Sequence, residues 1–341
     1  MTAHVADALD RYASITRAAL EEAVPSDLSE DHLRAPMLEY PRRGGKALRP
    51  ALCMATCEAF GGRFEDALPS AVALEMLHNA FLVHDDIEDA GTLRRGRPTL
   101  HLLYGTDRAL NAGDALALVG YGHLRRNRGL LGSALAERIG EEFDEMSRHT
   151  VDGQAIELGW RVENRLDLTP DDYLHLVMKK TCWYTTVTPM RVGALIGSRG
   201  TAPLAPMVRF GFHLGAAFQI RDDILDLEGD PDEFGKQPLG DLLEGKRTLM
   251  LLHLWAAADP PVRHLLATHL GRPARERTAE DAAAIVAAMQ AHGSLSFARE
   301  FARGVAADAL DAFEEAFAGV PDTPARRFVR DLVPYMVERV R

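Results

Sequence analysis

Apolar residues recur every three or four positions along most of this chain, and proline or glycine interrupts each run. Such spacing predicts amphipathic helices, because it places the apolar side chains on one face. The first run covers residues 3–22 and ends before Pro25, and the next two cover residues 51–60 and 66–90. A glycine pair separates these last two runs. The first quarter of the chain is therefore predicted to be helical.

The middle of the chain continues with longer runs. Helices are predicted over residues 107–138, 138–164, 171–199 and 207–228. Residues 248–341 show further helical runs with proline and glycine breaks and no recognisable chemical cluster. Alanine and leucine abound, while alternating stretches rich in Val, Ile and Thr are scarce, which favours helix. We predict an all-α fold and, since no repeat, low-complexity tract or flexible linker divides the chain, a single domain over residues 1–341.

One apolar helix ends in a dense group of carboxylates. Asp85 and Asp89 are four residues apart, so on a helix they share one face, and Asp86 lies beside them. Like charges at this spacing destabilise a helix by roughly 0.2–0.5 kcal/mol, and burial adds to that unless a cation lies between the carboxylates. Oxygen ligands without His or Cys at ligand spacing favour Mg²⁺, and the nearby Arg94 and Arg95 favour a phosphate bound through it.

The same aspartate spacing recurs at the end of the helix predicted over residues 207–228. Its members are Asp222, Asp223 and Asp226. A single acidic cluster is common on a solvated helix face, so either one alone is weak evidence. Two copies, each at the end of an apolar helix, favour two facing carboxylate sites that bind several Mg²⁺ ions and, through them, a diphosphate.

Candidate anion-binding residues stand on both sides of these clusters. Gly44 and Gly45 would let the backbone approach an anion, and Lys46 and Arg49 follow about one helical turn apart, although an ordinary surface loop has the same composition. His78 lies seven residues before the first aspartate and shares its helix face. It is either a hydrogen-bonded core histidine or part of the site.

Further cations lie in the second half of the chain. Lys179 and Lys180 interrupt an apolar helical pattern just before Thr181, and a lysine buried there requires an anion, although one of the two could reach solvent along the helix surface. Lys236 and Lys246 stand in two short basic segments after the second aspartate cluster. Both segments could bind phosphate oxygens.

Composition excludes several other classes of protein. The net charge of −11 argues against a nucleic-acid-binding protein, which would present a basic surface. Cys53, Cys57 and Cys182 form no disulfide framework, and the spacing of the first two within an apolar pattern indicates core positions. We see no signal peptide and no apolar run long enough to span a membrane. We therefore expect a cytoplasmic enzyme.

Taken in order, these motifs resemble those of the trans-polyprenyl diphosphate synthases, the short-chain prenyl-elongating enzymes of the isoprenoid synthase fold. The resemblance extends from about Gly44 to Thr248, and its ordered set is specific although each element alone is not. Its elements are Gly44-Gly45-Lys46, Arg49-Pro50, His78, Asp85-Asp86-x-x-Asp89, Arg94-Arg95-Gly96, Lys180-Thr181, Gly215-x-x-x-Gln219-x-x-Asp222-Asp223-x-x-Asp226, Gly235-Lys236 and Lys246. The resemblance implies long antiparallel helices around a deep central cavity, and a homodimer.

The resemblance also implies roles for individual residues. Three Mg²⁺ ions per active site would bind at Asp85, Asp89 and Asp222, with Asp86, Asp223 and Asp226 as further ligands or as groups that orient them. The allylic diphosphate would be bound by Arg94, Lys180, Thr181, Gln219, Lys236 and Lys246. Isopentenyl diphosphate would be bound by Lys46, Arg49, His78 and Arg95. The implied reaction is a head-to-tail condensation of these two substrates, and the main catalytic residues would be Asp85, Asp89, Lys180, Gln219 and Asp222.

Product length depends on the floor of the cavity below the first aspartate. Phe81 lies one turn below it, Ala80 lies beside Phe81, and Leu77 lies a turn lower. In the family, bulky residues at the first two positions limit chain length. One aromatic and one small residue, with only two residues between the aspartate pair and its final Asp, favour a C20 product over C15. Trp183 and Tyr184 are larger than expected and leave the cavity shape open.

Two other activities share parts of this pattern. A class I terpene cyclase has the same fold and an aspartate-rich Mg²⁺ site, but it needs no isopentenyl diphosphate site and usually has one such aspartate motif. A non-catalytic partner subunit of another prenyl synthase usually loses an aspartate motif, and both are intact here. We therefore expect a geranylgeranyl- or farnesyl-diphosphate-synthase-like prenyltransferase.

Overall fold

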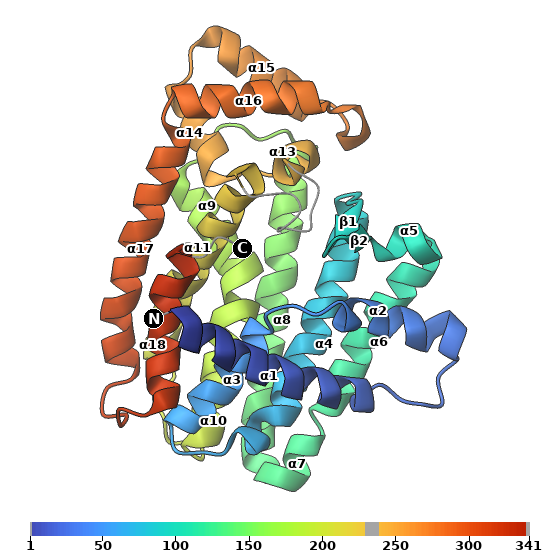
Figure 1. The fold of residues 1–341 in the computed structure, drawn as a ribbon, viewed down its shortest axis with the longest axis vertical. Helices are drawn as coiled ribbons and strands as arrows, with labels where there is room; N and C mark the ends of the chain where they lie inside the picture. The colour runs from blue at the N-terminus through green and yellow to red at the C-terminus, as the bar shows by residue number, and fades with distance from the viewer. Residues whose placement is uncertain (1, 229–238, 339–341) are drawn as a thin grey trace.

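The computed structural model describes residues 2–228 and 239–338, and nearly all of its regular structure is helical (Figure 1). The helices of the first half are α1 (Thr2–Ala23), η1 (Glu30–Arg34), α2 (Ala35–Arg42), α3 (Leu48–Ala59), α4 (Phe64–Glu88), α5 (Leu100–Tyr104), α6 (Thr106–His123), α7 (Arg126–Leu131) and α8 (Ser133–Val162). Those of the second half are α9 (Pro170–Val177), η2 (Met178–Val187), α10 (Thr188–Gly197), α11 (Ala205–Glu228), α13 (Gly240–Glu244), α14 (Leu249–Ala257), α15 (Pro260–Gly271), η3 (Ala274–Glu276), α16 (Ala279–Ala291), α17 (Ser294–Ala316) and α18 (Pro324–Glu338).

The predicted all-α class is confirmed, and one predicted boundary is wrong. The helix expected over residues 107–138 is divided into α6, α7 and the start of α8. Gly132 has a φ of +89°, which ends α7 and lets α8 begin at Ser133. The apolar spacing continues across this break, so periodicity alone did not show it.

The structure also contains a short hairpin that the sequence did not predict. Strands β1 (Leu93–Arg94) and β2 (Arg97–Pro98) pair antiparallel. Arg95 and Gly96 form the two-residue turn with φ of +53° and +72°, the backbone of a hairpin turn in which both central residues are left-handed. We call residues 93–98 the arginine hairpin, because it carries Arg94 and Arg95.

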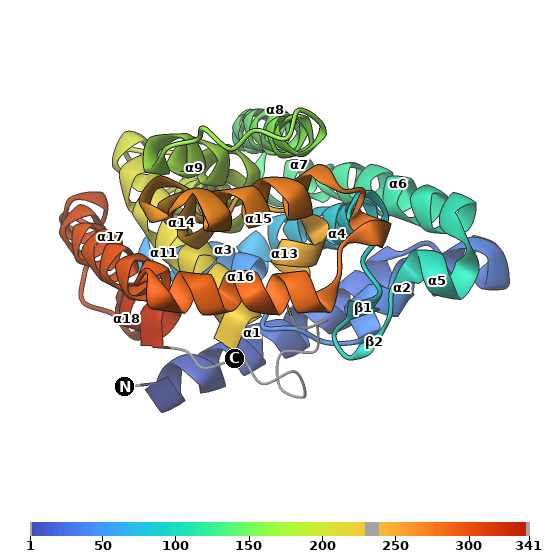
Figure 2. The ribbon, with the colours of Figure 1, turned by 90° about the horizontal axis from the view of Figure 1, so that it is seen from above.

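Long helices α4 and α11 lie near the middle of the molecule, while α8 lies along one side and α1, α17 and α18 lie on other sides (Figures 1 and 2). Seen from above, α15 and α16 cover one end of this arrangement (Figure 2). The main core lies between these helices, and a second buried cluster fills the space between α2, α4 and α6. No helix of the described ranges is both long and apolar enough to cross a membrane.

The three cysteines are buried and unpaired, as expected for core residues. Cys53 and Cys57 face α10, where Gly193 and Gly197 have the same four-residue spacing. A Cβ atom at Gly193 would be 2.3 Å from the Cys53 carbonyl oxygen, and one at Gly197 would be 2.3 Å from that of Cys57. Glycine at both positions therefore allows α3 and α10 to pack backbone to backbone.

Candidate active site

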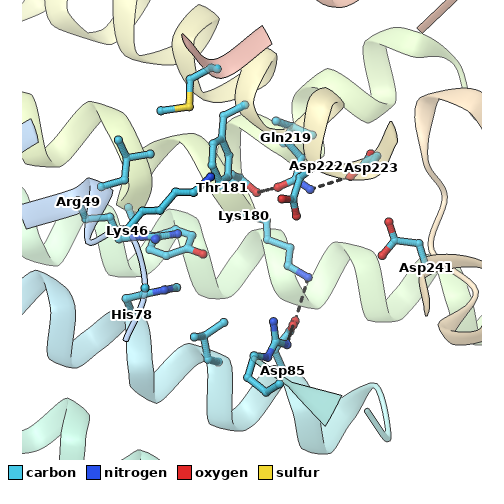
Figure 3. A pocket seen from close by; sticks show the side chains of 18 of the residues that line it. Lys46, Arg49, His78, Asp85, Lys180, Thr181, Gln219, Asp222, Asp223 and Asp241 are labelled. Atoms are coloured by element: carbon cyan, nitrogen blue, oxygen red, sulfur yellow. Dashed lines mark hydrogen bonds and ion pairs between the residues drawn. The ribbon is translucent and has the colours of Figure 1, made fainter. Parts of the chain in front are cut away.

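A cavity of about 660 Å³ opens between α4, η2, α11 and the loop before α3. Its two ends differ in charge (Figure 3): Lys46, Arg49 and His78 gather at one end, while carboxylates gather at the other. Lys180 projects from η2 between them. The structure therefore brings together cations and carboxylates that are up to about two hundred residues apart in the sequence.

At the cationic end, Arg49 is fixed by two neighbours. Its Nη2 donates to Thr185 Oγ1 at 2.8 Å, and its guanidinium lies 4.2 Å from the ring centre of Tyr184. Arg95 lies beside the loop at Gly45, where a Cβ atom would be 2.7 Å from Arg95 Nη2. Glycine at position 45, where φ is +136°, leaves room for this guanidinium, so one member of the glycine pair expected to approach an anion also makes space for a cation.

His78 lies at the same end, on the α4 face that continues to Asp85. Burial, together with the positive charges of Arg49 and Arg95, holds the pKa of His78 well below its usual range. The imidazole is therefore neutral at neutral pH and offers a hydrogen bond rather than a charge. Glu75, one turn earlier on α4, also lines the cavity.

At the other end, Asp85 is surrounded by cations. Lys180 Nζ is 3.2 Å from Asp85 Oδ1, and Arg94 Nη2 is 3.8 Å from Asp85 Oδ2. Although burial would raise it, the charges of Lys180, Lys246 and Arg94 hold the pKa of Asp85 well below its usual range. Lys180 also pairs with Glu157 of α8. The carboxylate stays ionised and the lysine stays protonated.

The other two aspartates of this motif face different partners. Asp89 pairs with Arg161 Nη1 at 2.6 Å and with Lys246 Nζ at 3.1 Å. Neither Asp86 nor Asp89 is among the residues lining the cavity, and Asp86 is bound by Tyr40 and Arg94. The spacing argument placed Asp85 and Asp89 on one face correctly and left the direction of Asp86 undetermined.

The second aspartate motif lies across the cavity, on α11. Asp222 and Asp223 line the cavity, and Asp226 accepts a hydrogen bond from the Asp241 amide at 3.0 Å. Asp223 accepts hydrogen bonds from Gln219 Nε2 at 2.7 Å and from the Tyr173 hydroxyl at 2.8 Å. Burial, with the negative charge of Asp241, raises the pKa of Asp223 well above its usual range.

Gln219 connects this motif to η2. Its Oε1 accepts a hydrogen bond from Thr181 Oγ1 at 3.0 Å while its Nε2 donates to Asp223 (Figure 3). Both residues line the cavity next to Lys180. Lys180, Thr181 and Gln219, which the sequence assigned to one substrate, therefore form one continuous surface.

Lys246 lies at the carboxylate end among acidic side chains, two of which, Asp241 and Glu244, were not predicted from the sequence. Its Nζ is 2.6 Å from Glu244 and 3.5 Å from Asp241. Burial and the charges of Asp89 and Asp241, opposed by Lys246, raise the pKa of Glu244 to about 7. Asp241 lines the cavity, and its place five residues before Lys246 was the only available signal.

Arg161 was also missed, although it stands one helical turn after Glu157 on α8. Arg247 lines the cavity, and its guanidinium donates to the Arg165 carbonyl and to Asn164, which attaches this loop to the end of α8. Lys236, expected at the allylic diphosphate, lies outside the described residues.

The carboxylates suit a hard divalent cation in their chemistry, since all of them offer oxygen. Within residues 2–228 and 239–338, no three His, Cys, Asp or Glu side chains converge as a ready-made ligand set. Instead, Lys180, Lys246 and Arg161 neutralise the aspartates. The residues therefore fit Mg²⁺ that arrives with a diphosphate, whose oxygens would complete the coordination.

The floor positions lie on the α4 helix below Asp85. Leu77 and Ala80 are fully packed in the two cores, and Phe81 is partly buried with its ring 5.6 Å from the Tyr184 ring in an edge-on contact. Tyr184 lines the cavity. Trp183 points away and stacks on His149 at 4.4 Å. Of the two unexpectedly large residues, only Tyr184 shapes the cavity.

Comparison with known proteins agrees with this geometry. A family model described as polyprenyl synthetase matches residues 30–289. This chain belongs to the polyprenyl synthetase family. Among curated members, the short chain isoprenyl diphosphate synthase of Methanothermobacter thermautotrophicus is 30% identical, over 98% of each chain. Members of similar identity are named as farnesyl, geranylgeranyl and geranylfarnesyl diphosphate synthases.

Solved structures of polyprenyl synthetases have the same fold. A polyprenyl synthase from Caulobacter crescentus, complexed with calcium and isoprenyl diphosphate, superposes with a TM-score of 0.86 at 27% identity and 98% coverage of both chains. A geranylgeranyl pyrophosphate synthase from Corynebacterium glutamicum, complexed with isoprenyl diphosphate and magnesium, gives a TM-score of 0.83 at 25% identity and 99% coverage of both. The predicted isoprenoid synthase fold and the prenyltransferase class are confirmed.

Proposed function

We propose that this polyprenyl synthetase condenses isopentenyl diphosphate with an allylic diphosphate in a Mg²⁺-dependent head-to-tail reaction, and that C20 geranylgeranyl diphosphate is its main product. The observation that supports this most is the division of one cavity into a cationic end and a carboxylate end (Figure 3). The two diphosphate substrates have different roles, so each needs its own binding site, and the hydrocarbon ends of both substrates must meet between these sites. A terpene cyclase does not bind isopentenyl diphosphate and therefore needs no cationic end of this kind.

At the carboxylate end, the allylic diphosphate would lie near Asp85, Asp89 and Asp222. Bound Mg²⁺, for which we propose three ions per site, would act there as a Lewis acid and neutralise the departing diphosphate. Lys180 and Lys246, both held protonated among carboxylates, would add fixed positive charge to the same oxygens. Arg94 would approach from the arginine hairpin.

At the cationic end, Lys46, Arg49 and Arg95 would bind isopentenyl diphosphate, and neutral His78 would add a hydrogen bond. The double bond of this substrate would then face the allylic carbon. Thr181 and Gln219 would direct their oxygen dipoles at the carbon that loses its diphosphate, and the apolar walls would exclude water from it.

Product length rests on Phe81 and Tyr184. Phe81 packs edge-on against Tyr184, which lines the cavity, and the small Ala80 is packed in the core beside it. An aromatic pair with one small neighbour supports C20 over C15. The diversity of chain lengths among the named relatives is consistent with a floor that a small number of substitutions is enough to alter.

We also propose that the protein is a homodimer. Large apolar side chains are exposed on neighbouring helices α5 and α6, among them Leu102, Leu110 and Leu118, the last of which is 75% exposed. A surface of this kind is typical of a protein–protein contact. Light scattering of the purified protein tests this, and Leu118→Glu should lower the dimer fraction.

An incubation with Mg²⁺, labelled isopentenyl diphosphate and one allylic primer at a time tests the proposal. Dimethylallyl, geranyl and farnesyl diphosphates should each be elongated, and mass spectrometry should show a ladder ending at C20. A ladder ending at C15 would contradict the chain length alone. A hydrocarbon or alcohol formed from the allylic substrate without elongation would indicate a cyclase, and inactivity with every primer would indicate a partner subunit.

A further inference from the structure

The end of α2 and the arginine hairpin are joined through the hydroxyl of Tyr40. This side chain is 1% exposed. Its hydroxyl donates to Asp86 Oδ2 at 2.6 Å and accepts from the Leu100 amide at 2.8 Å, where the chain leaves the hairpin and enters α5. One buried hydroxyl thus connects three elements, α2, α4 and α5.

Asp86 transmits this connection to Arg94. Arg94 Nε lies 3.1 Å from Asp86 Oδ1 and 3.2 Å from Oδ2, while its Nη2 reaches Asp85 at 3.8 Å. Asp86 is therefore saturated by a hydroxyl on one side and a guanidinium on the other. Buried carboxylates with two such partners hold them in a fixed geometry.

The end of α2 also holds the rest of the hairpin, through the Tyr40 carbonyl and the Arg43 side chain. Arg95 Nη1 donates to the Tyr40 carbonyl at 3.0 Å. Arg43, one turn further on, donates to the carbonyls of Arg94 at 2.9 Å and Pro98 at 2.8 Å, and its guanidinium lies over the Tyr40 ring at 4.7 Å. The arginine hairpin is thus fixed by hydrogen bonds from the Arg95 and Arg43 side chains to backbone carbonyls, in addition to the Asp86 link.

We propose that Tyr40 is a positioning residue for the reaction: through Asp86, its hydroxyl sets the place of the Arg94 guanidinium at the carboxylate end of the cavity. Tyr40 does not itself line the cavity. Without its hydroxyl, Asp86 loses one of two partners, and Arg94 gains freedom to shift toward Asp85. Arg95 is held by the Tyr40 carbonyl, which a side-chain substitution does not remove. This inference rests on the proposed binding of the allylic diphosphate by Arg94.

Tyr40→Phe tests the proposal, because it removes the hydroxyl alone. We expect the KM for the allylic diphosphate to rise about fivefold, as expected for one net hydrogen bond, with little change in the KM for isopentenyl diphosphate. The decisive measurement is a double-mutant cycle with Arg94→Gln. If Tyr40 acts through Arg94, adding Tyr40→Phe to Arg94→Gln should change the allylic KM no further.

Tyr12→Phe is the matched control. The Tyr12 hydroxyl is also buried and also donates to a carboxylate, that of Glu58, but Tyr12 does not line the cavity or contact the hairpin. It should change the melting temperature and leave both KM values unaltered. The proposal is overturned if the effect of Tyr40→Phe is the same in both backgrounds, or if both KM values rise equally. Failure of the wild-type protein to elongate any primer would instead contradict the proposed function.

Discussion

Gly153 of α8 lies directly against the backbone of Lys180. A Cβ atom at Gly153 would be 2.3 Å from the Lys180 amide nitrogen and 2.7 Å from its Cα atom. Rotation of a side chain in η2 could not relieve this clash, because the close atoms belong to the main chain of η2. The absence of one carbon atom on α8 therefore determines where the lysine at the centre of the cavity stands.

Gly153→Ala should push η2 away from α8 and displace Lys180. We expect a loss of about 1–3 kcal/mol in the free energy of unfolding and a fall in kcat. The matched control is Gly159→Ala on the same helix, where a Cβ atom would meet nothing within 4 Å. That variant should be neutral or more stable by about 0.4–1 kcal/mol. Urea unfolding and steady-state kinetics measure both, and equal behaviour of the two variants would contradict the close contact.

Removing both carboxylates of the first motif, in Asp85→Ala/Asp89→Ala, should abolish turnover while the far-UV circular dichroism stays helical. The physical reason is the loss of the oxygen ligands proposed for Mg²⁺, with Lys180 still paired to Glu157. Asp152→Ala is the control, because Asp152 pairs with the adjacent Lys179 at the surface, where such a pair is worth at most about 1 kcal/mol. An unchanged rate in the double variant would refute the metal assignment.

Asp86→Asn and Asp85→Asn should differ in their response to Mg²⁺. Asp85 lines the cavity, so its amide variant should need far more Mg²⁺ for half-maximal rate. Asp86 is bound by Tyr40 and Arg94, so its variant should keep the wild-type Mg²⁺ dependence and raise the allylic KM. Titration of the rate with Mg²⁺ at saturating substrates distinguishes them. A higher Mg²⁺ requirement for Asp86→Asn would contradict this prediction and indicate that Asp86 is a metal ligand.

Phe81→Ala should lengthen the product beyond C20, because it removes the ring that packs against Tyr184, a residue that lines the cavity. Mass spectrometry of the products checks this. Phe301→Ala is a suitable control, since Phe301 is a partly buried ring of α17 that packs against Phe297 rather than against Tyr184, the ring that lines the cavity. The same product distribution in both variants would show that Phe81 is not the floor.

Stability should fall below pH 6.5 partly because of His269. Its side chain is fully buried, its Nε2 faces the Leu242 carbonyl at 3.1 Å, and burial lowers its pKa. The unfolded chain takes up a proton near pH 6.5 while the folded protein stays neutral, so the unfolded state binds more protons and stability falls as pH decreases toward the folded pKa. His269→Gln should reduce this slope by up to about 1.4 kcal/mol per pH unit. Urea unfolding at pH 7, 6 and 5 measures it, and parallel curves would contradict the shift.

The helices and most cavity residues could be predicted because both depend on local spacing. Four-residue intervals place Asp85 with Asp89 on one face, and a lysine in an apolar run indicates a buried anion. The structure shows Lys180 beside Asp85, across ninety-five positions of sequence. Periodicity predicts such a face but not its partner.

What the sequence did not show depends on contacts between distant elements. Nothing near Tyr40 indicates that its hydroxyl binds Asp86, and Arg161 stands among other surface-like charges although it reaches Asp89. The arginine hairpin was missed because its strands are two residues long, shorter than any alternation that could be recognised. The direction of a single side chain within a motif, such as that of Asp86, depends on partners from distant elements and could not be predicted.

Lys180 and Thr181 stand in η2, a ten-residue segment of π-helix between α9 and α10. In a π-helix an amide bonds to the carbonyl five residues earlier, as the Thr188 amide does to the Trp183 carbonyl, so the segment has more residues per turn than its neighbours. A helical wheel drawn through residues 170–197 as one α-helix therefore loses phase at this point. Deleting one residue between Thr181 and Val187 would favour ordinary α-helical winding and change the position of Lys180 relative to α10. The position of the central lysine is thus encoded partly in the length of this segment, which no single substitution can reproduce.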